Sequence, residues 1–297
     1  MLDLSGLRNP VWRTADRLRD PAVLPVENGY LVFYSRFSAN RVWPDPHAWA
    51  VACAFTSNFH TFEHDRDVTA KGFASPGDVV FWGGRWVLPY QSYPANPTRL
   101  CFSESHDLHT WHAPTFFLGE ANALPWNTRQ RAIDPTFVVD SDVLHCFFVG
   151  SCATETPDRY TNVVGHAVST DPGLQRWQVL TRDAPLIGRS QAAHTDAGAN
   201  NVAVFRTDDS WTLIYSAGVV DQHLAWARSP DLLHWECKGA LPLHAQRWMS
   251  RKHGAPFVWR EGDGYVMILM GTDAADWTTF GLLTSRDGVR WAPLPEQ

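Results

Sequence analysis

The chain has 297 residues, 44% of them hydrophobic and 19% charged, which is the composition of an ordinary globular protein. The net charge of −6, with no basic run or stripe, argues against nucleic acid or an anionic membrane as a partner. No apolar stretch is long enough for a membrane span, and residues 1–12 lack the pattern of a secretory signal. The five scattered cysteines favour a reducing compartment, so we expect a cytoplasmic protein.

A pair of short apolar strands joined by a polar turn recurs five times along the chain. Asn-Gly, Gly-Gly and Asp-Gly occur at three of these turns, and such residues tolerate the positive φ of tight β-hairpins. The strand pairs are expected, in chain order, at 20–26 with 30–35, 79–81 with 85–92, 134–139 with 143–150, 202–205 with 211–216 and 256–259 with 265–271. A third strand follows each pair, and no helical periodicity of useful length is present.

A polar Ser/Thr turn followed by an aromatic residue closes each of the five copies. The closing aromatics are Phe62, Trp111, Trp177, Trp235 and Trp291, spaced 49, 66, 58 and 56 residues apart. A repeat of this length built from strands predicts an all-β, five-bladed β-propeller with four antiparallel strands in each blade. We expect a single domain over 1–297, with blades at roughly 15–65, 70–115, 130–180, 196–240 and 250–295. The closing aromatics are expected to pack between blades.

The starts of the first strands should converge on the central axis, although they lie far apart in the sequence. Asp20-Pro21 and Asp134-Pro135 occupy equivalent places in blades 1 and 3, and proline should hold each Asp in an extended conformation. The other blades place Asp78, Asn200 and His253 near the same level. Two carboxylates in one partly desolvated funnel suit glycoside hydrolysis, which needs an acid and a base or nucleophile.

These motifs resemble those of the five-bladed propeller glycoside hydrolases, especially family 43. Asn9-Pro10 ahead of Arg19-Asp20-Pro21 resembles the opening of that family, Ala132-Ile133-Asp134-Pro135 its blade-3 motif and His253-Gly254 its blade-5 histidine. The resemblance implies that Asp20 is the general base and that Asp134 orients the general acid and tunes its pKa. It also implies a histidine near the axis that often helps to hold a metal ion or water. No cofactor is expected to be required, and an axial calcium ion is possible on this resemblance.

The chain departs from the family pattern at the general acid, because Asn200 stands where the family has a glutamate. We take Asp196 as the substitute acid, with His194 and Glu120 as alternatives, or else a leaving group that needs no acid. His194 could act as an acid near neutral pH. The expected substrate-binding residues are Asp78, His194, Asn200, His253 and Glu120.

The sequence therefore predicts an inverting glycoside hydrolase that acts on a short oligosaccharide or glycoside. The alternative is a propeller that binds carbohydrate without cleaving it. A weaker third reading is transfer or phosphorolysis, for which Arg13, Arg19, Arg131 and Arg251 could form an anion pocket. Exposed loop aromatics such as Trp43 would suit stacking against sugar faces. The sugar, the linkage and the oligomeric state are left open.

Overall fold

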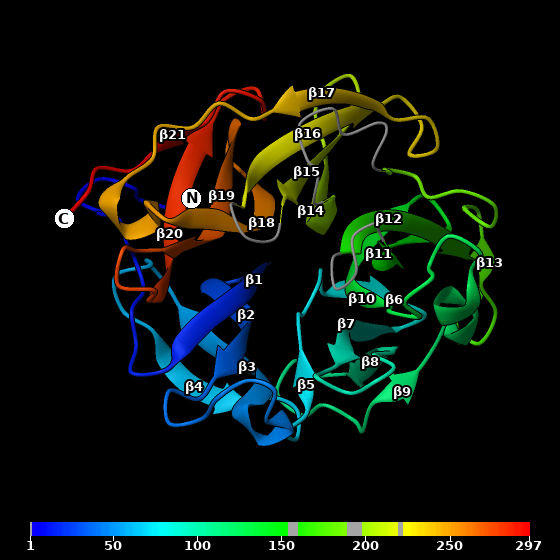
Figure 1. The fold of residues 1–297 in the computed structure, drawn as a ribbon. Coiled ribbons are helices and arrows are strands. Elements are labelled where there is room, and N and C mark those ends of the chain that lie inside the picture. Colours follow the sequence, from blue (N-terminus) through cyan, green and yellow to red (C-terminus); the bar gives the residue numbers. More distant parts are fainter. Residues whose placement is uncertain (1, 154–159, 189–197, 219–221) are drawn as a thin grey trace.

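The structure, a computed structural model, describes residues 2–153, 160–188, 198–218 and 222–297. Over these residues it is almost entirely β-structure, with five sheets arranged around a central axis (Figure 1). The prediction of a five-bladed propeller with four antiparallel strands per blade is confirmed. The inner strands β1, β10, β14 and β18 lie nearest the centre of the ring (Figure 1).

The strands follow the chain from the inside of each blade to its outer edge. Blade 1 contains β1 (Arg17–Val26), β2 (Gly29–Phe37), β3 (Trp49–Thr56) and β4 (Glu63–Asp67). Blade 3 contains β10 (Ile133–Asp140), β11 (Val143–Ala153), β12 (Tyr160–Ser169) and β13 (Gln178–Val179). Blade 4 contains β14 (Ala199–Arg206), β15 (Trp211–Ala217), β16 (His223–Ser229) and β17 (Glu236–Ala240). Blade 5 contains β18 (Lys252–Glu261), β19 (Gly264–Thr272), β20 (Thr278–Ser285) and β21 (Ala292–Pro293).

Blade 2 differs because its inner strand is broken into two pieces. β5 (Phe73–Ala74) and β6 (Val80–Trp82) both pair with β7 (Arg85–Ser92), which is followed by β8 (Leu100–Ser105) and β9 (Thr115–Phe116). The break contains Pro76 and Gly77, and proline has no N–H to donate to a strand partner. A Cβ on Gly77 would lie 1.9 Å from the Pro135 carbonyl oxygen, so blade 3 approaches the chain closely here.

The repeated polar turn has the same hydrogen-bonded structure in different blades. In blade 4, the Ser229 hydroxyl accepts the Asp231 N–H, and the Asp231 carboxylate accepts the N–H groups of Leu233 and His234. Leu232 adopts a left-handed φ of 64°, and Trp235 donates its indole N–H to the Leu232 carbonyl at 2.9 Å. The closing tryptophan therefore completes the turn as well as packing against the core.

The N-terminal segment closes the ring against blade 5. The buried Asn9 amide donates to the carbonyls of Leu282 and Leu294 and to Gln246, and its oxygen accepts the Leu282 N–H at 2.8 Å. Val11 and Trp12 continue this contact along β20 through backbone bonds with Phe280. Residues near the N-terminus thus complete the sheet of blade 5, which contains the last strands of the chain.

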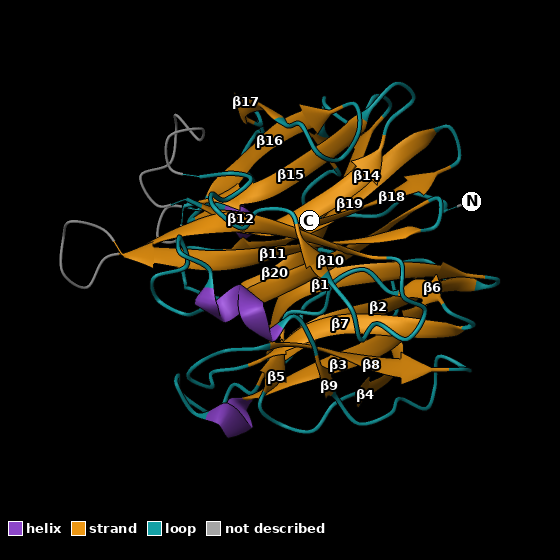
Figure 2. Ribbon diagram, turned by 90° about the vertical axis from the view of Figure 1, so that its right-hand side faces the viewer, coloured by secondary structure: helices purple, strands orange, loops and turns teal. Residues whose placement is uncertain are grey.

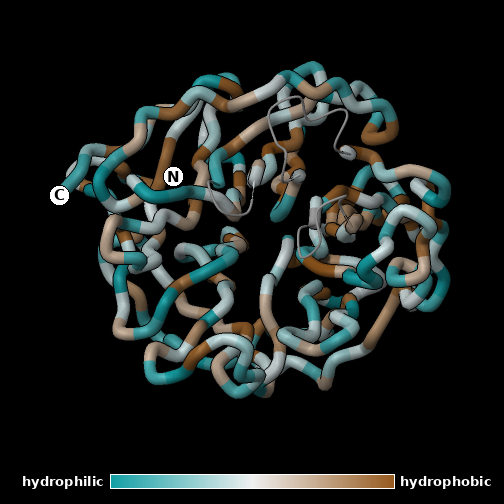
Figure 3. The backbone as a smooth tube through the Cα atoms, viewed as in Figure 1, coloured by the Kyte–Doolittle hydropathy of each residue, from teal (hydrophilic) through white to brown (hydrophobic). Residues whose placement is uncertain are grey.

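Short 3-10 helices lie at the end of the propeller that also carries the starts of the inner strands. These are η1 (Pro46–Ala48), η2 (Gly119–Ala123) and η3 (Arg247–Met249), drawn in purple in Figure 2. Hydrophobic residues concentrate within the blades, while many connecting turns are hydrophilic (Figure 3). Among the described residues, no helix has the length and apolar character needed to cross a lipid bilayer.

Candidate functional site

A ring of five residues with left-handed backbone conformation surrounds the axis, one from each blade. The ring consists of Asp20, Ser75, Asp134, Asn201 and Ala255, with φ values of 49°, 53°, 51°, 40° and 48°. In four blades the inner strand shows a register shift at this level, which is a β-bulge. The expectation of an extended backbone at the two Asp-Pro pairs is wrong, because the bulge turns each Asp out of the ladder.

Side chains from the preceding blade hold three ring residues through their backbone N–H groups. The Ser35 hydroxyl accepts the Ser75 N–H at 2.6 Å, and the Ser216 hydroxyl accepts the Ala255 N–H at 2.7 Å. The Gln91 amide oxygen accepts the Asp134 N–H. An N–H turned out of the ladder by the bulge thus gains a partner, which makes the ring geometry depend on neighbouring blades.

Asp20 accepts hydrogen bonds from three side chains on three blades. Ser35 and Ser75 donate to Oδ2 at 2.8 and 3.1 Å, and the Asn201 amide donates to Oδ1 at 3.2 Å. Burial raises the pKa of Asp20, while these donors and the Arg19 charge lower it in part. The donors therefore favour an ionised Asp20 in a site that would otherwise disfavour charge.

Asp134 is the second carboxylate of the ring and is 8% exposed. Burial raises its pKa, and the nearby Asp20 charge raises it further, while Arg131, Ser75 and the Asn201 backbone N–H lower it. Ser75 and Asn201 therefore influence both carboxylates. A buried carboxylate pair of this kind favours one ionised and one protonated member at moderately acidic pH.

Both carboxylates line a funnel of about 220 Å³, whose other polar lining includes Asn162, Asn200, Asn201, Gln222 and Lys252. Asp78 lies below the ring, in a narrow axial channel that it shares with the two carboxylates and the inner-strand prolines. Burial raises the pKa of Asp78 to about 7. Asp78 thus faces the axis beneath the ring instead of the funnel.

Asn200 lines the funnel one residue before the ring position. Its amide oxygen accepts from Asn162, and its NH₂ group donates to the Gly218 carbonyl at 3.2 Å. The Asn162 oxygen in turn accepts from the Ser151 hydroxyl at 2.5 Å. Asn200 is therefore fixed in a buried amide network, and an amide cannot supply a proton as a general acid.

His253 and Glu120, two further residues predicted from the sequence, lie apart from the two carboxylates. His253 is not among the residues that line the funnel or the axial channel, and burial and the neighbouring His223 lower its pKa to about 4. Glu120 is exposed on η2 and pairs with Arg182 at 3.0 Å. Asp196 and His194 lie outside the described residues.

The funnel is rich in cationic side chains. Arg19, Arg131 and Lys252 line it, whereas Arg13 and Arg251 do not. Arg13 lies over the Trp277 ring at 5.9 Å, and Arg251 pairs with Asp276 at 2.7 Å. Of the four arginines named from the sequence for an anion pocket, two therefore reach the site.

A calcium ion does not fit the donor set of the described residues. No group of three or more His, Cys, Asp or Glu side chains is placed there to hold a metal ion. The two ring carboxylates already accept protein donors, and cations line the same funnel. We therefore assign no step to a metal.

A second cavity of about 410 Å³ adjoins the funnel and shares Arg19, Trp49 and Tyr93 with it. Trp43, which is 64% exposed, lines this cavity and donates its indole N–H to the Tyr93 hydroxyl at 3.2 Å. The sequence could suggest Trp43 only as a loop aromatic, because its hydrogen-bond partner Tyr93 comes from another blade.

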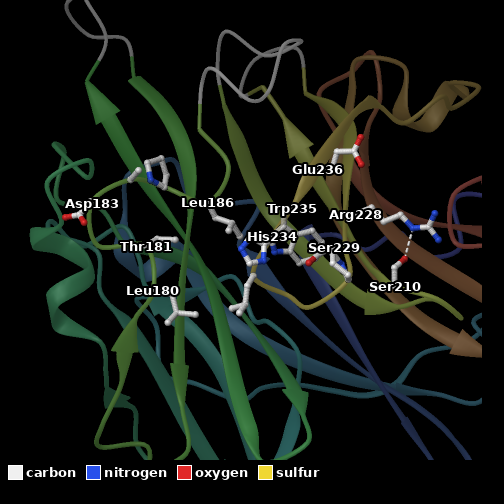
Figure 4. A pocket seen from close by; sticks show the side chains of 14 residues that line it. Leu180, Thr181, Asp183, Leu186, Ser210, Arg228, Ser229, His234, Trp235 and Glu236 are labelled. Atoms are coloured by element: carbon white, nitrogen blue, oxygen red, sulfur yellow. Dashed lines mark hydrogen bonds between the residues drawn. The ribbon is translucent and has the colours of Figure 1, made fainter.

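The largest cavity described, about 760 Å³, lies away from the ring between the outer parts of blades 3 and 4. Figure 4 shows Leu186, His234 and Trp235 in this groove, with Arg228 bonded to Ser210 at 2.6 Å on one side. None of the predicted site residues lines it. Its size alone assigns it no chemistry.

Solved structures of several glycoside hydrolases have a fold similar to that of this chain. A thermostable family-43 glycoside hydrolase matches 98% of this chain and 97% of its own, with a TM-score of 0.68 and 16% identity. The α-L-arabinanase of Cellvibrio cellulosa, complexed with arabinohexaose, matches 96% of this chain and 99% of its own, with a TM-score of 0.66 and 13% identity. At such identities the likeness establishes the fold, which is the one that the sequence motifs indicated.

Sequence comparison gives one curated relative and no family model. The sucrose-6-phosphate hydrolase of Pediococcus pentosaceus is 22% identical over 231 residues, or 72% of this chain. This match spans 43% of the relative, so the chain covers less than half of that protein's length. No protein-family model matches the sequence.

Proposed function

We propose that this protein is a glycoside hydrolase that cleaves a short oligosaccharide or glycoside in the axial funnel. The observation that carries the proposal is the pair of carboxylates, Asp20 and Asp134, at equivalent bulges of blades 1 and 3. Similar folds belong to glycoside hydrolases, and the curated relative is named for hydrolysing a phosphorylated disaccharide. The five cysteines are free, which supports a reducing, cytoplasmic location.

In this proposal Asp20 is the general base of an inverting reaction. Its three donors favour the ionised form against burial, and the ionised carboxylate takes a proton from a water that attacks the anomeric carbon. Asp134, whose backbone N–H is held by Gln91, orients the general acid and tunes its pKa in this proposal. Cleavage of the C–O bond then requires a proton on the leaving oxygen.

The general acid in this proposal is Asp196, with His194 as the alternative. Asn200 cannot supply a proton, and Asp20 and Asp134 are the carboxylates that line the funnel among the described residues. We further propose that Asn200 and His194 bind the substrate, whereas Asp78, His253 and Glu120 do not line the funnel. Asn200 has the strongest claim, because it lines the funnel.

The proposal is tested with a panel of nitrophenyl glycosides and matching disaccharides. Asp20→Ala should lower kcat/KM by about 10²–10⁴, as expected for loss of a general base. Asp196→Ala should impair disaccharides far more than nitrophenyl glycosides, because nitrophenolate leaves without a proton. Equal losses on both substrates would remove Asp196 from the acid role, and NMR of the first-formed anomer tests inversion.

A propeller that binds carbohydrate without cleaving it is the second candidate, and the fixed Asn200 amide favours it. It predicts sugar binding by calorimetry but no hydrolysis of any glycoside in the panel. Hydrolysis that persists unchanged in both Asp20→Asn and Asp134→Asn would instead show that the funnel is not the catalytic centre.

A further inference from the structure

The funnel and the adjoining cavity have a charge opposite to that of the whole molecule. The chain carries a formal net charge of −6. Among the described residues, five cationic side chains line the two cavities, against two carboxylates, Asp20 and Asp134. The cations are Arg17, Arg19, Arg41, Arg131 and Lys252. Walls of one sign focus the electrostatic potential, so this entrance attracts anions.

Two of these cations form no ion pair at contact distance within the described parts of the chain, although Asp20 lies near Arg19 and Asp276 near Lys252. Arg17 pairs with Asp276 at 3.7 Å and Arg41 with Asp45 at 3.0 Å, both at the outer side of the second cavity. No such ion pair forms at Arg19 or Lys252 in the described residues, and the buried Arg19 Nε has no hydrogen-bond partner there. A buried guanidinium N–H left without an acceptor is costly.

Arg19 stands where the two cavities meet. It lines both, and its guanidinium lies over the Trp49 ring at 5.8 Å. Burial lowers the pKa of Lys252, the charges of Arg19 and Arg251 lower it further, and the charge of Asp276 raises it in part. Arg19 and Lys252 therefore repel one another, and an anion placed with them would relieve that repulsion.

Aromatic side chains give the same space a wall suited to a sugar ring. Trp43 and Tyr93 are joined by a hydrogen bond and line the second cavity beside Arg19. Carbohydrates pack their C–H faces on aromatic rings, while phosphate and carboxylate groups bind guanidinium donors in pairs. The ligand that satisfies both features is a sugar that bears an anionic group.

We propose that the substrate is an anionic carbohydrate, and that Arg19 with Lys252 binds its phosphate ester or carboxylate beside the Trp43 wall. The statement that the anionic sugar is cleaved rests on the proposed function, whereas the statement that it binds does not. It defines Arg19 and Lys252 as specificity residues.

The test is calorimetric binding to the full chain carrying Asp20→Asn, which prevents turnover. The probes include three matched pairs of a neutral and a phosphorylated sugar: glucose and glucose 6-phosphate, fructose and fructose 6-phosphate, and arabinose and arabinose 5-phosphate. Glucuronate, galacturonate and inorganic phosphate are tested beside them. At least one charged sugar should bind about 10-fold or more tightly than its neutral partner, as a charge-assisted hydrogen bond implies. Preference for the phosphorylated sugars or for the uronates distinguishes the two anions.

Arg19→Gln and Lys252→Gln should each abolish most of this preference. Arg260→Gln, at an exposed position in blade 5, is the matched control and should preserve it. Equal affinities within every pair, or a preference that survives both funnel variants, would overturn the inference. Inorganic phosphate that binds as tightly as the sugar phosphates would also overturn it, in favour of phosphorolysis. Anionic sugars that bind without any glycoside being hydrolysed would leave the inference standing and reject the hydrolase.

Discussion

Removal of the Asn201 side chain should shift the pH dependence of the reaction toward higher pH. The Asn201 amide donates to Asp20 at 3.2 Å and stabilises its ionised form. Asn201→Ala removes this donor but keeps the backbone N–H that acts on Asp134. Alanine is tolerable in this left-handed conformation, because Ala255 adopts it at the equivalent position of blade 5.

The magnitude follows from the geometry of that bond. Hydrogen bonds to charged groups contribute about 1.5–3 kcal/mol, and this one is long and leaves Asp20 two other donors. The lower end of the range, about 1.5 kcal/mol, corresponds to about one pKa unit. Since Asp20 must be ionised to act as a base, a higher pKa should move the acid limb of kcat/KM up by about one unit.

The assay is the pH profile of kcat/KM for wild type, Asn201→Ala and the exposed control Asn40→Ala. The rate well above the pKa should change little, because the base is then ionised in all three proteins. An acid limb of Asn201→Ala that coincides with that of wild type, or lies at lower pH, would refute the assignment of Asp20 as the base.

Two further predictions concern stability. The pKa of Asp78, raised to about 7 by burial, exceeds that of an unfolded Asp, so its ionisation weakens the fold progressively as pH rises from about 4 to 7. Asp78→Asn should therefore raise the free energy of unfolding at pH 8 by up to about 4 kcal/mol, measured by urea unfolding. The same substitution should have little effect at pH 4. Equal effects at both pH values would contradict this prediction. Asn9→Ala should destabilise by about 3 kcal/mol, because it leaves buried groups of Leu282 and Leu294 unpaired, and should lower Tm by roughly 6–10 °C. A Tm equal to that of Asn40→Ala would argue that water replaces the Asn9 amide.

The repeat was predictable because its chemistry is local. The Ser229–Trp235 turn forms hydrogen bonds within seven residues, and similar turns recur near Ser105, Ser169 and Ser285. Asp20 and Asp134 were predictable for a related reason, because each stands before a proline at the start of an inner strand.

The ring partners of these carboxylates were missed because the bulge depends on pairing with the next strand. Ser75 and Asn201 become donors to Asp20 only once three blades surround the axis. A signal for part of the ring was present, since Ser75-Pro76 and Ala255-Pro256 repeat the residue–proline pattern of the two Asp-Pro pairs. The cationic lining was less accessible, because Arg19 and Lys252 lie 233 positions apart in the sequence and meet only when blade 5 closes against blade 1.

The inter-blade bonds of the ring have a consequence for how the protein should lose function. Ser35, Gln91 and Ser216 each fix the ring residue of the next blade, so no blade builds the site alone. Loss of the contact between two neighbouring blades would displace a carboxylate, while most strands stay paired within their own sheets. Mild heating should therefore abolish ligand binding before the far-ultraviolet spectrum changes, and isolated blades should retain no partial activity.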